Sequence, residues 1–404
     1  MMIDLVLFKK EMEDELGNIL KYWMEYAKDE AHGGFTGRVN YFNQSDTVAD
    51  KGSVLNSRIL WTFSAAFLAT KNPVYGDFAQ RAYHYFITHF ADKEHGGVYW
   101  SVDYKGDPAD RKKQVYAQSF AIYALSEYYR ATGSTDARQL AIDLFNTIEQ
   151  YSYDSIKGGY IDAFAENWSV RTDLRLSAKD ANEKKTMNTH LHVLEAYCNL
   201  YSVWADQTLK TKIENLLHNF NTHIIDSSTG HLALFFDENW KPQATLISYG
   251  HDIEAAWLLQ EAAETICDTA WIDTTKELAI KLAAAAREGL DTDGGLWYEY
   301  DPANHHLVKE KHWWPQAEAV VGFFNAWQIS GQEIYLYYAL NTWNFIKKHI
   351  RDTKHGEWVW GVRADNVAMQ EQDKVGIWKC PYHNSRMCLE MIKRLSAASG
   401  MIER

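Results

Sequence analysis

Apolar residues recur at three- and four-residue spacing in twelve separate stretches, a period typical of helices that bury one face. Six stretches lead into a glycine-containing segment, at 16–29, 78–92, 137–154, 212–226, 275–290 and 335–352. The other six follow that segment after a loop, at 54–68, 117–131, 188–204, 253–264, 318–329 and 384–396. This second set is nearly apolar all round, so we predict that it lies inside a shell formed by the first set.

A glycine followed by aromatic or aliphatic residues separates the two helices of each pair. These segments recur every 62 to 72 residues, which is the signature of a repeat architecture. We expect the glycines to allow positive φ at tight turns, and the residues beside them to form short β-hairpins. The segments begin at Gly33, Gly96, Gly158, Gly230, Gly294 and Gly356.

Six helix pairs could stack into an open solenoid or close into a ring. The buried character of the second helices favours an all-α (α/α)6 barrel, or toroid, with short β-hairpins in its connections. No linker interrupts the rhythm, so we expect residues 1–404 to form a single catalytic domain. The polar stretch 166–185 widens one interval and predicts a surface loop or lid.

Residues capable of chemistry stand 20 to 34 positions after each glycine, where the second helices begin. In a closed barrel these starts meet at one end, so the side chains would share one cavity. His251 and Glu254 are three apart and can share a helix face, which outlines a general acid/base. The full set is Arg58, Tyr116, Asn188 with His192, His251 with Glu254, Trp314 with Glu318, and Trp378 with His383.

Each of these residues also has a structural interpretation. A single histidine at a helix start is more often a cap or a core residue, and Arg58 alone could be an ion-pair partner. Burying so many ionisable groups together is costly unless they have a function. His190 and His192 are two apart and diverge, which disfavours a chelating pair, and no HExxH arrangement is present, so we predict no metal. The lack of a Walker A or GxGxxG motif predicts no nucleotide cofactor.

The composition limits which kinds of partner and which cellular compartment we expect for the protein. A net charge of -13 without a basic run disfavours nucleic acid, and the 46% apolar content can fill a large core. No stretch is apolar enough to span a membrane, and the N-terminus lacks the features of a signal peptide. The four cysteines form no CxxC pair. We expect a cytoplasmic protein that binds a small molecule and is a monomer or weak homodimer.

Five blocks of the sequence, in the same order, resemble the N-acylglucosamine 2-epimerase superfamily, and within it the branch that epimerises cellobiose. The blocks are NSRILW at 56–61, KTMNTHLH at 185–192, SYGHDIE at 248–254, QAE at 316–318 and WKCPYHN at 378–384. The resemblance implies an (α/α)6 barrel and cofactor-free epimerisation at C2 of the reducing-end sugar of β-1,4-linked disaccharides such as cellobiose, lactose or mannobiose.

The resemblance also implies roles for individual residues. His251 and His383 would be the acid/base pair at C2, with His383 removing the proton from the gluco substrate. His192 would assist ring opening, Arg58 would polarise the oxygens on C1 and C2, and Glu254 would be the partner of His251. Positions that match substrate-binding residues of the superfamily are Tyr116, Asn188, Trp257, Trp314, Glu318 and Trp378.

The residue types fit this chemistry. Ring opening makes the C2 proton acidic, one histidine removes it, and a second histidine returns a proton on the opposite face of the enediolate. Arg58 would supply positive charge where the enediolate oxygens become negative. Pro315 and Ser385 depart from the superfamily's usual pattern next to the candidate site, which leaves the preferred disaccharide open.

Three other functions remain possible at this point. A monosaccharide 2-epimerase or an aldose–ketose isomerase of the same superfamily shares the enediolate. A glycoside hydrolase on the same toroid needs two facing carboxylates, for which Glu254 and Glu318 are the candidates. A non-catalytic carbohydrate-binding protein needs only the aromatic residues.

Overall fold

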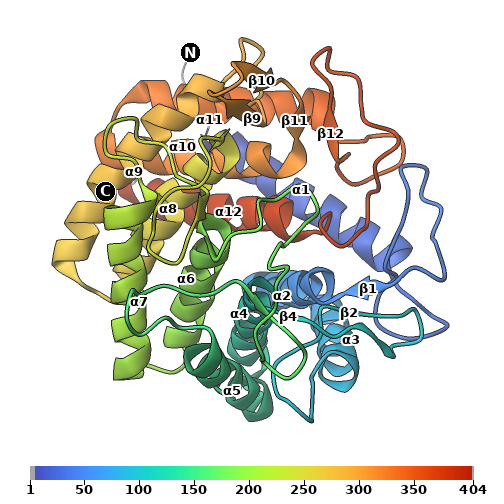
Figure 1. The fold of residues 1–404 in the computed structure, drawn as a ribbon. Helices are drawn as coiled ribbons and strands as arrows, with labels where there is room; N and C mark the ends of the chain where they lie inside the picture. Colours follow the sequence, from blue (N-terminus) through green and yellow to red (C-terminus); the bar gives the residue numbers. More distant parts are fainter. Residues whose placement is uncertain (1–4, 403–404) are drawn as a thin grey trace.

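Twelve α-helices, alternating between an outer and an inner layer, make up most of the computed structural model, which describes residues 5–402 (Figure 1). The outer helices are α1 (Leu5–Tyr26), α3 (Pro73–His89), α5 (Thr135–Tyr151), α7 (Gln207–Asn219), α9 (Thr269–Ala286) and α11 (Glu333–Phe345), the last three extended by η1 (Phe220–Ile224), η2 (Arg287–Gly289) and η3 (Ile346–Ile350). The inner helices are α2 (Ser53–Thr70), α4 (Val115–Thr132), α6 (Met187–Tyr201), α8 (Tyr249–Thr265), α10 (Trp313–Ser330) and α12 (Tyr382–Ile402).

The inner helices form a closed ring. Each packs against the next one along the chain, from α2 through α12, and α12 returns to pack against α2. Each inner helix also packs on the outer helix that follows it, and α12 packs on α1, beside which it lies in Figure 1. The predicted (α/α)6 barrel is therefore confirmed, and the open solenoid is wrong.

The burial of each layer follows its sequence pattern. Every residue of α2 from Ser53 to Ala66 is buried, whereas α5 buries one face through residues such as Ala137, Ala141 and Leu144. Inner helices begin up to five residues earlier than predicted, because polar and aromatic site residues in their first turn interrupt the apolar pattern. No helix between residues 5 and 402 has both the length and the apolar character to cross a bilayer.

Short antiparallel strands join neighbouring repeats into a rim around the starts of the inner helices. The strand before an inner helix pairs with the strand after the next glycine turn, and a bridge from Val375 back to Val39 closes the rim. The predicted β-hairpins are present as well, where 101–102 pairs with 108–110 and 299–301 pairs with 306–308. The strands are β1 (Lys51–Gly52), β2 (Ser101–Val102), β3 (Pro108–Asp110), β4 (Lys113–Gln114), β5 (Ala163–Phe164), β6 (Lys185–Thr186), β7 (Phe235–Phe236), β8 (Ile247–Ser248), β9 (Glu299–Asp301), β10 (His306–Val308), β11 (Lys311–His312) and β12 (Gly361–Val362).

In four of the six inner helices, α4, α6, α8 and α10, the fourth residue holds the glycine turn that precedes the helix. Gln118 of α4 accepts a hydrogen bond from the Val98 amide at 2.7 Å, and a Cβ atom on Gly97 (φ +77°) would lie 2.9 Å from the Gln118 oxygen. His190 has the same place in α6, where Nε2 accepts from the Tyr160 amide at 2.9 Å. His190 is therefore a structural anchor, in agreement with the prediction that it diverges from His192.

Candidate active site

A cavity of about 870 Å³ lies at the end of the barrel where the inner helices start. This volume is within the usual range for small-molecule sites. Nine of the eleven predicted site residues line the cavity: Arg58, Tyr116, Asn188, His192, His251, Glu254, Trp314, Trp378 and His383. Residues 174–181 and Glu183 also line it, so the loop predicted as a lid does lie at the cavity.

The repeat arranges the site residues in two layers, because each inner helix enters the ring in the same direction. The second or third residue of five helices supplies the first layer, and the fifth or sixth residue supplies the second layer, one turn deeper. The first layer contains Tyr116, Asn188, His251, Trp314 and His383, and the second contains Arg58, His192, Glu254, Glu318 and Arg386.

Two histidines of the first layer share one aromatic neighbour. The Trp314 indole packs against His251 with ring centroids 4.7 Å apart, and against His383 with centroids 5.6 Å apart. His251 Nδ1 lies 2.8 Å from Ser248 Oγ, and His383 Nδ1 lies 2.7 Å from Glu318 Oε1. In both rings Nδ1 is engaged by the protein, so Nε2 is the nitrogen available to a ligand.

Both imidazoles are neutral at physiological pH. Burial lowers the pKa of His251 to about 3, with the nearby His192 ring and the Lys179 ammonium group acting in the same direction. Burial also lowers the pKa of His383 far below its usual value, helped by Arg58 and Arg386. A neutral imidazole has a lone pair and can act as a general base.

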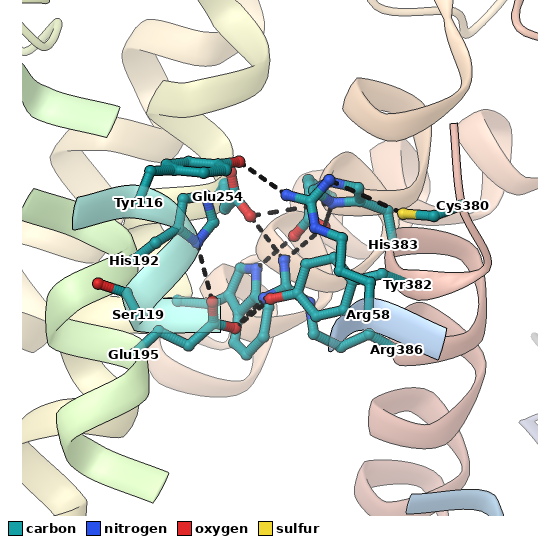
Figure 2. Close-up of polar contacts among 12 residues, drawn as sticks. Arg58, Tyr116, Ser119, His192, Glu195, Glu254, Cys380, Tyr382, His383 and Arg386 are labelled. Carbon is teal, nitrogen blue, oxygen red and sulfur yellow. Dashed lines mark hydrogen bonds and ion pairs between the residues drawn. The ribbon is translucent and has the colours of Figure 1, made fainter. Parts of the chain in front are cut away.

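Arg58 brings a positive charge to the cavity wall without a carboxylate to balance it. Its side chain is buried, and within the described residues no carboxylate lies within ion-pair distance of it. Nη2 donates to Tyr116 Oη at 2.7 Å, and Nη1 lies 3.7 Å from Cys380 Sγ (Figure 2). The guanidinium also packs 4.1 Å from the centroid of the Phe120 ring. An unpaired buried charge is costly, so this site favours an anionic group.

Arg386, which the sequence analysis missed, occupies the centre of the second layer (Figure 2). Nη2 donates to Glu254 Oε1 and to Glu318 Oε1, both at 2.6 Å. Nη1 hydrogen-bonds to Glu195 and to Tyr382. One guanidinium therefore orients three buried carboxylates, and two of these hold histidines of the cavity.

Glu195 is the carboxylate partner of His192, and it was also missed. Glu195 Oε2 lies 2.9 Å from His192 Nδ1. Although burial raises the pKa of Glu195, Arg386 and His192 bring it down to about 2. The signal was present in the sequence, because Glu195 follows His192 by three residues, and Arg386 follows His383 by three.

Three of the predicted placements need correction. His251 and Glu254 do not pair, since His251 binds Ser248 and the Glu254 carboxylate binds Arg386. Trp257 and Glu318 do not line the cavity; Trp257 Nε1 donates to Glu318 Oε2 at 3.0 Å beneath it. The spacing rule placed His251 and Glu254 three residues apart in α8, but it could not show that an arginine from α12 binds the Glu254 carboxylate.

Glu254, Glu318 and His383 have ligand atoms within 4.8 Å of one another, a spacing that a metal ion could use. The Arg386 guanidinium already binds both carboxylates, so a second cation there would meet its positive charge. Burial raises the pKa of Glu254 and of Glu318 even with this arginine present. We assign this group to hydrogen bonding of the histidine rather than to a metal.

Comparisons with known proteins agree with the geometry. The sequence profile of the N-acylglucosamine 2-epimerase (GlcNAc 2-epimerase) family matches residues 33–386. A cellobiose 2-epimerase of Bacteroides fragilis is 49% identical over 96% of this chain and 99% of its own length. A sugar epimerase from a ruminal bacterium has a crystal structure that superposes with a TM-score of 0.92 at 38% identity, covering 96% of this chain and 99% of its own. The structure of cellobiose 2-epimerase from Bacillus thermoamylovorans superposes with a TM-score of 0.91 at 38% identity, covering 96% of this chain and 99% of its own.

Proposed function

The chain belongs to the N-acylglucosamine 2-epimerase family, and on this premise we propose that it inverts C2 of the reducing-end sugar in β-1,4-linked disaccharides, converting cellobiose to glucosyl-mannose. The observation that carries the proposal is that His251 and His383 line one cavity and contact one indole, and that Arg58 lines the same cavity. Lactose and mannobiose offer the same reducing-end chemistry.

In the proposed reaction, two histidines work on opposite faces of C2. Nε2 of His383 removes the C2 proton from the open-chain gluco sugar, and His251, in the tautomer whose Nδ1 accepts from Ser248 Oγ, delivers its Nε2 proton to the other face. His383 then releases its proton to solvent, and solvent returns one to His251. The reverse reaction exchanges these roles, as microscopic reversibility requires. The lowered pKa of His383 keeps its base form populated, and Glu318 and Ser248 hold the two rings through Nδ1.

Arg58 and Tyr116 stabilise the enediolate in this scheme. Loss of the C2 proton places negative charge on the C1 and C2 oxygens, next to a guanidinium that has no carboxylate of its own. Arg58 Nη2 donates to Tyr116 Oη, which leaves the tyrosine hydroxyl proton free to donate to a sugar oxygen. Preformed positive charge in a site screened from water is an effective way to lower such a barrier.

His192 is the proposed catalyst of ring opening. It lines the cavity one turn below the first layer, and Glu195 holds its Nδ1. The His192 ring packs on the rings of Tyr116 and Phe120, with centroids 5.0 and 4.8 Å apart, so its orientation is fixed. Opening the pyranose requires a proton to move between O1 and the ring oxygen, for which an oriented imidazole is suited.

Two observations weigh against hydrolysis. Hydrolysis would need Glu254 and Glu318 as its carboxylate pair, but both accept hydrogen bonds from the same nitrogen of Arg386. Glu318 also does not line the cavity. A glycosidase needs its two carboxyl groups on either side of the scissile bond. A pure binding protein would not need three neutral histidines beside an unpaired arginine.

The test is to incubate the protein with cellobiose in D2O and to follow the reducing-end sugar by NMR. The proposal predicts a manno product with deuterium at C2. Free glucose would indicate hydrolysis, a ketose would indicate isomerisation, and no change would indicate binding alone. Each of these three outcomes contradicts the proposal as stated.

We further propose that the whole chain works as one catalytic domain, without a cofactor, in the cytoplasm and as a monomer or weak homodimer. All four cysteines are free, and three of them are buried, which suits a reducing compartment. Sedimentation of the purified protein at micromolar concentration tests the oligomeric state.

A further inference from the structure

Two repeats hold their glycine turn with a single glutamine side chain. In α4, Gln118 accepts from the Val98 amide at 2.7 Å and donates to the Val98 carbonyl at 2.9 Å. In α10, Gln316 does the same with Leu296, at 2.7 and 2.8 Å. A neutral amide satisfies both backbone groups, so this anchor does not change with pH.

The fourth repeat uses an acid and a histidine in place of that glutamine. Asp252 has the same position in α8, and its Oδ1 accepts from the Leu232 amide at 2.9 Å. Its Oδ2 lies 2.7 Å from Nδ1 of His231, which stands where most repeats have their second glycine. Both side chains are buried. The turn and the helix start are therefore joined through a titratable pair.

The fourth repeat also lacks a second anchor. In four other repeats, a buried lysine two residues before the inner helix binds an aspartate of the glycine turn, as Lys113 binds Asp92 at 2.6 Å. Ile247 occupies that position before α8. The four lysines are Lys51, Lys113, Lys185 and Lys311, bound to Asp29, Asp92, Asp154 and Asp291.

Asp252 directly follows His251 in the first turn of α8. We infer that His231 and Asp252 are positioning residues for the epimerisation, whose ion pair fixes the first turn of α8 and thereby orients His251. The inference rests on the proposed function, because it assigns His251 to proton transfer. A displacement of a reacting group by about 1 Å can cost roughly a hundredfold in rate, so a loosened helix start would lower turnover.

The charged and titratable neighbours of His231 set the direction of its pH response. Besides Asp252 it faces Glu288, whose Oε2 lies 3.4 Å from Nε2, and Tyr249, with ring centroids 6.0 Å apart. Lys281 packs on the neighbouring Gly230. Burial lowers the pKa of His231, but Asp252 and Glu288 outweigh it and raise that pKa above 6.5.

The raised pKa of His231 means that folding favours its protonated form. The stabilisation from this histidine is complete below pH 6.5 and is lost as pH rises through its folded pKa. Burial raises the pKa of Asp252, so the ion pair exists between the two folded pKa values. Turnover should therefore fall as pH rises through the folded pKa of His231, in a way that depends on this pair.

Three proteins test the inference: the wild type, Asp252→Asn, and the double variant His231→Gly/Asp252→Gln, which transplants the Gly–Gln anchor of the second and fifth repeats. Rates with cellobiose are measured from pH 6 to pH 9 by NMR. We expect Asp252→Asn to lose about tenfold or more in kcat with little change in KM, since His251 acts in the chemical step. We expect the double variant to recover most of that loss and to show a flatter alkaline limb than the wild type.

Wild-type kcat in Asp252→Asn, or an unchanged alkaline limb in the double variant, would overturn the inference. If Asp252→Asn does not fold, the double variant alone decides through its pH profile. Hydrogen exchange of wild-type residues 249–254 needs no variant and should speed up between pH 7 and pH 9 beyond the intrinsic increase. An inactive wild type would contradict the proposed function instead, so the two failures are distinguishable.

Discussion

His383 Nδ1 lies 2.7 Å from Glu318 Oε1, beneath the cavity floor, while the His383 ring itself lines the cavity. This contact selects which nitrogen of the histidine faces the substrate. Arg386 in turn binds Glu318 Oε1 at 2.6 Å, which fixes the carboxylate. The ring that is proposed to remove the C2 proton is thus oriented by a carboxylate and an arginine that never touch the sugar.

Replacing Glu318 with glutamine should impair turnover while leaving binding largely intact. The amide can donate to His383 Nδ1 and so stabilise the tautomer whose Nε2 carries a proton and cannot act as a base. By analogy with other oriented histidines, we expect kcat to fall by about a hundredfold or more. The rate is measured by NMR with cellobiose. Glu264→Gln, at the far end of α8, is the matched control; equal rates in both variants would show that the contact has no catalytic role.

Replacing each of two buried arginines with methionine should have different effects on the stability of the protein. Arg58 has no carboxylate partner, so Arg58→Met should abolish turnover without lowering the melting temperature. Arg386→Met leaves three buried carboxylates without their cation and should cost about 3–5 kcal/mol of unfolding free energy. Differential scanning calorimetry measures the stability of both variants, and NMR with cellobiose measures the turnover of Arg58→Met. Similar destabilisation by the two variants would mean that Arg58 is a structural residue.

The rate should stay high well below the pH at which free histidine becomes charged. The pKa of His251 is about 3 and that of His383 is also lowered, so both remain neutral in mildly acidic solution. We expect kcat/KM for cellobiose to be nearly flat from pH 7 to pH 5.5. A half-loss of kcat/KM near pH 6.5 would show that at least one catalytic imidazole has an ordinary pKa.

His190→Gln should make the fold more tolerant of acid. Burial lowers the pKa of His190 to about 4, so protons bind the unfolded chain first and stability falls as pH drops below 6.5. This one group accounts for about 2 kcal/mol between pH 7 and pH 5. Glutamine accepts the equivalent hydrogen bond from the glycine turn at this position in α4 and α10. Urea unfolding should show that the free energy of unfolding falls less between pH 7 and pH 5 in the variant than in the wild type, and cellobiose turnover should persist. An equal fall in both proteins would contradict the assignment of His190 as the acid-sensitive anchor.

The sequence was most informative where the repeat imposes a pattern. Helix count, ring closure and the cavity residues followed from apolar spacing and from equal positions in successive repeats. Arg386 was missed because its contacts join helices far apart in sequence and leave no local pattern. Glu195 was missed although its three-residue spacing from His192 is a local signal. The same three-residue spacing wrongly paired His251 with Glu254, because the Glu254 carboxylate binds Arg386 of α12, a helix distant in sequence.

Single-histidine variants in D2O test the two-base mechanism most directly. We predict that His251→Ala and His383→Ala each lose epimerisation almost completely while both fold. Each should still exchange the C2 proton of one epimer without inversion: cellobiose in His251→Ala, where His383 remains, and glucosyl-mannose in His383→Ala. Epimerisation at the wild-type rate by either variant, or exchange of the same epimer by both, would contradict the mechanism.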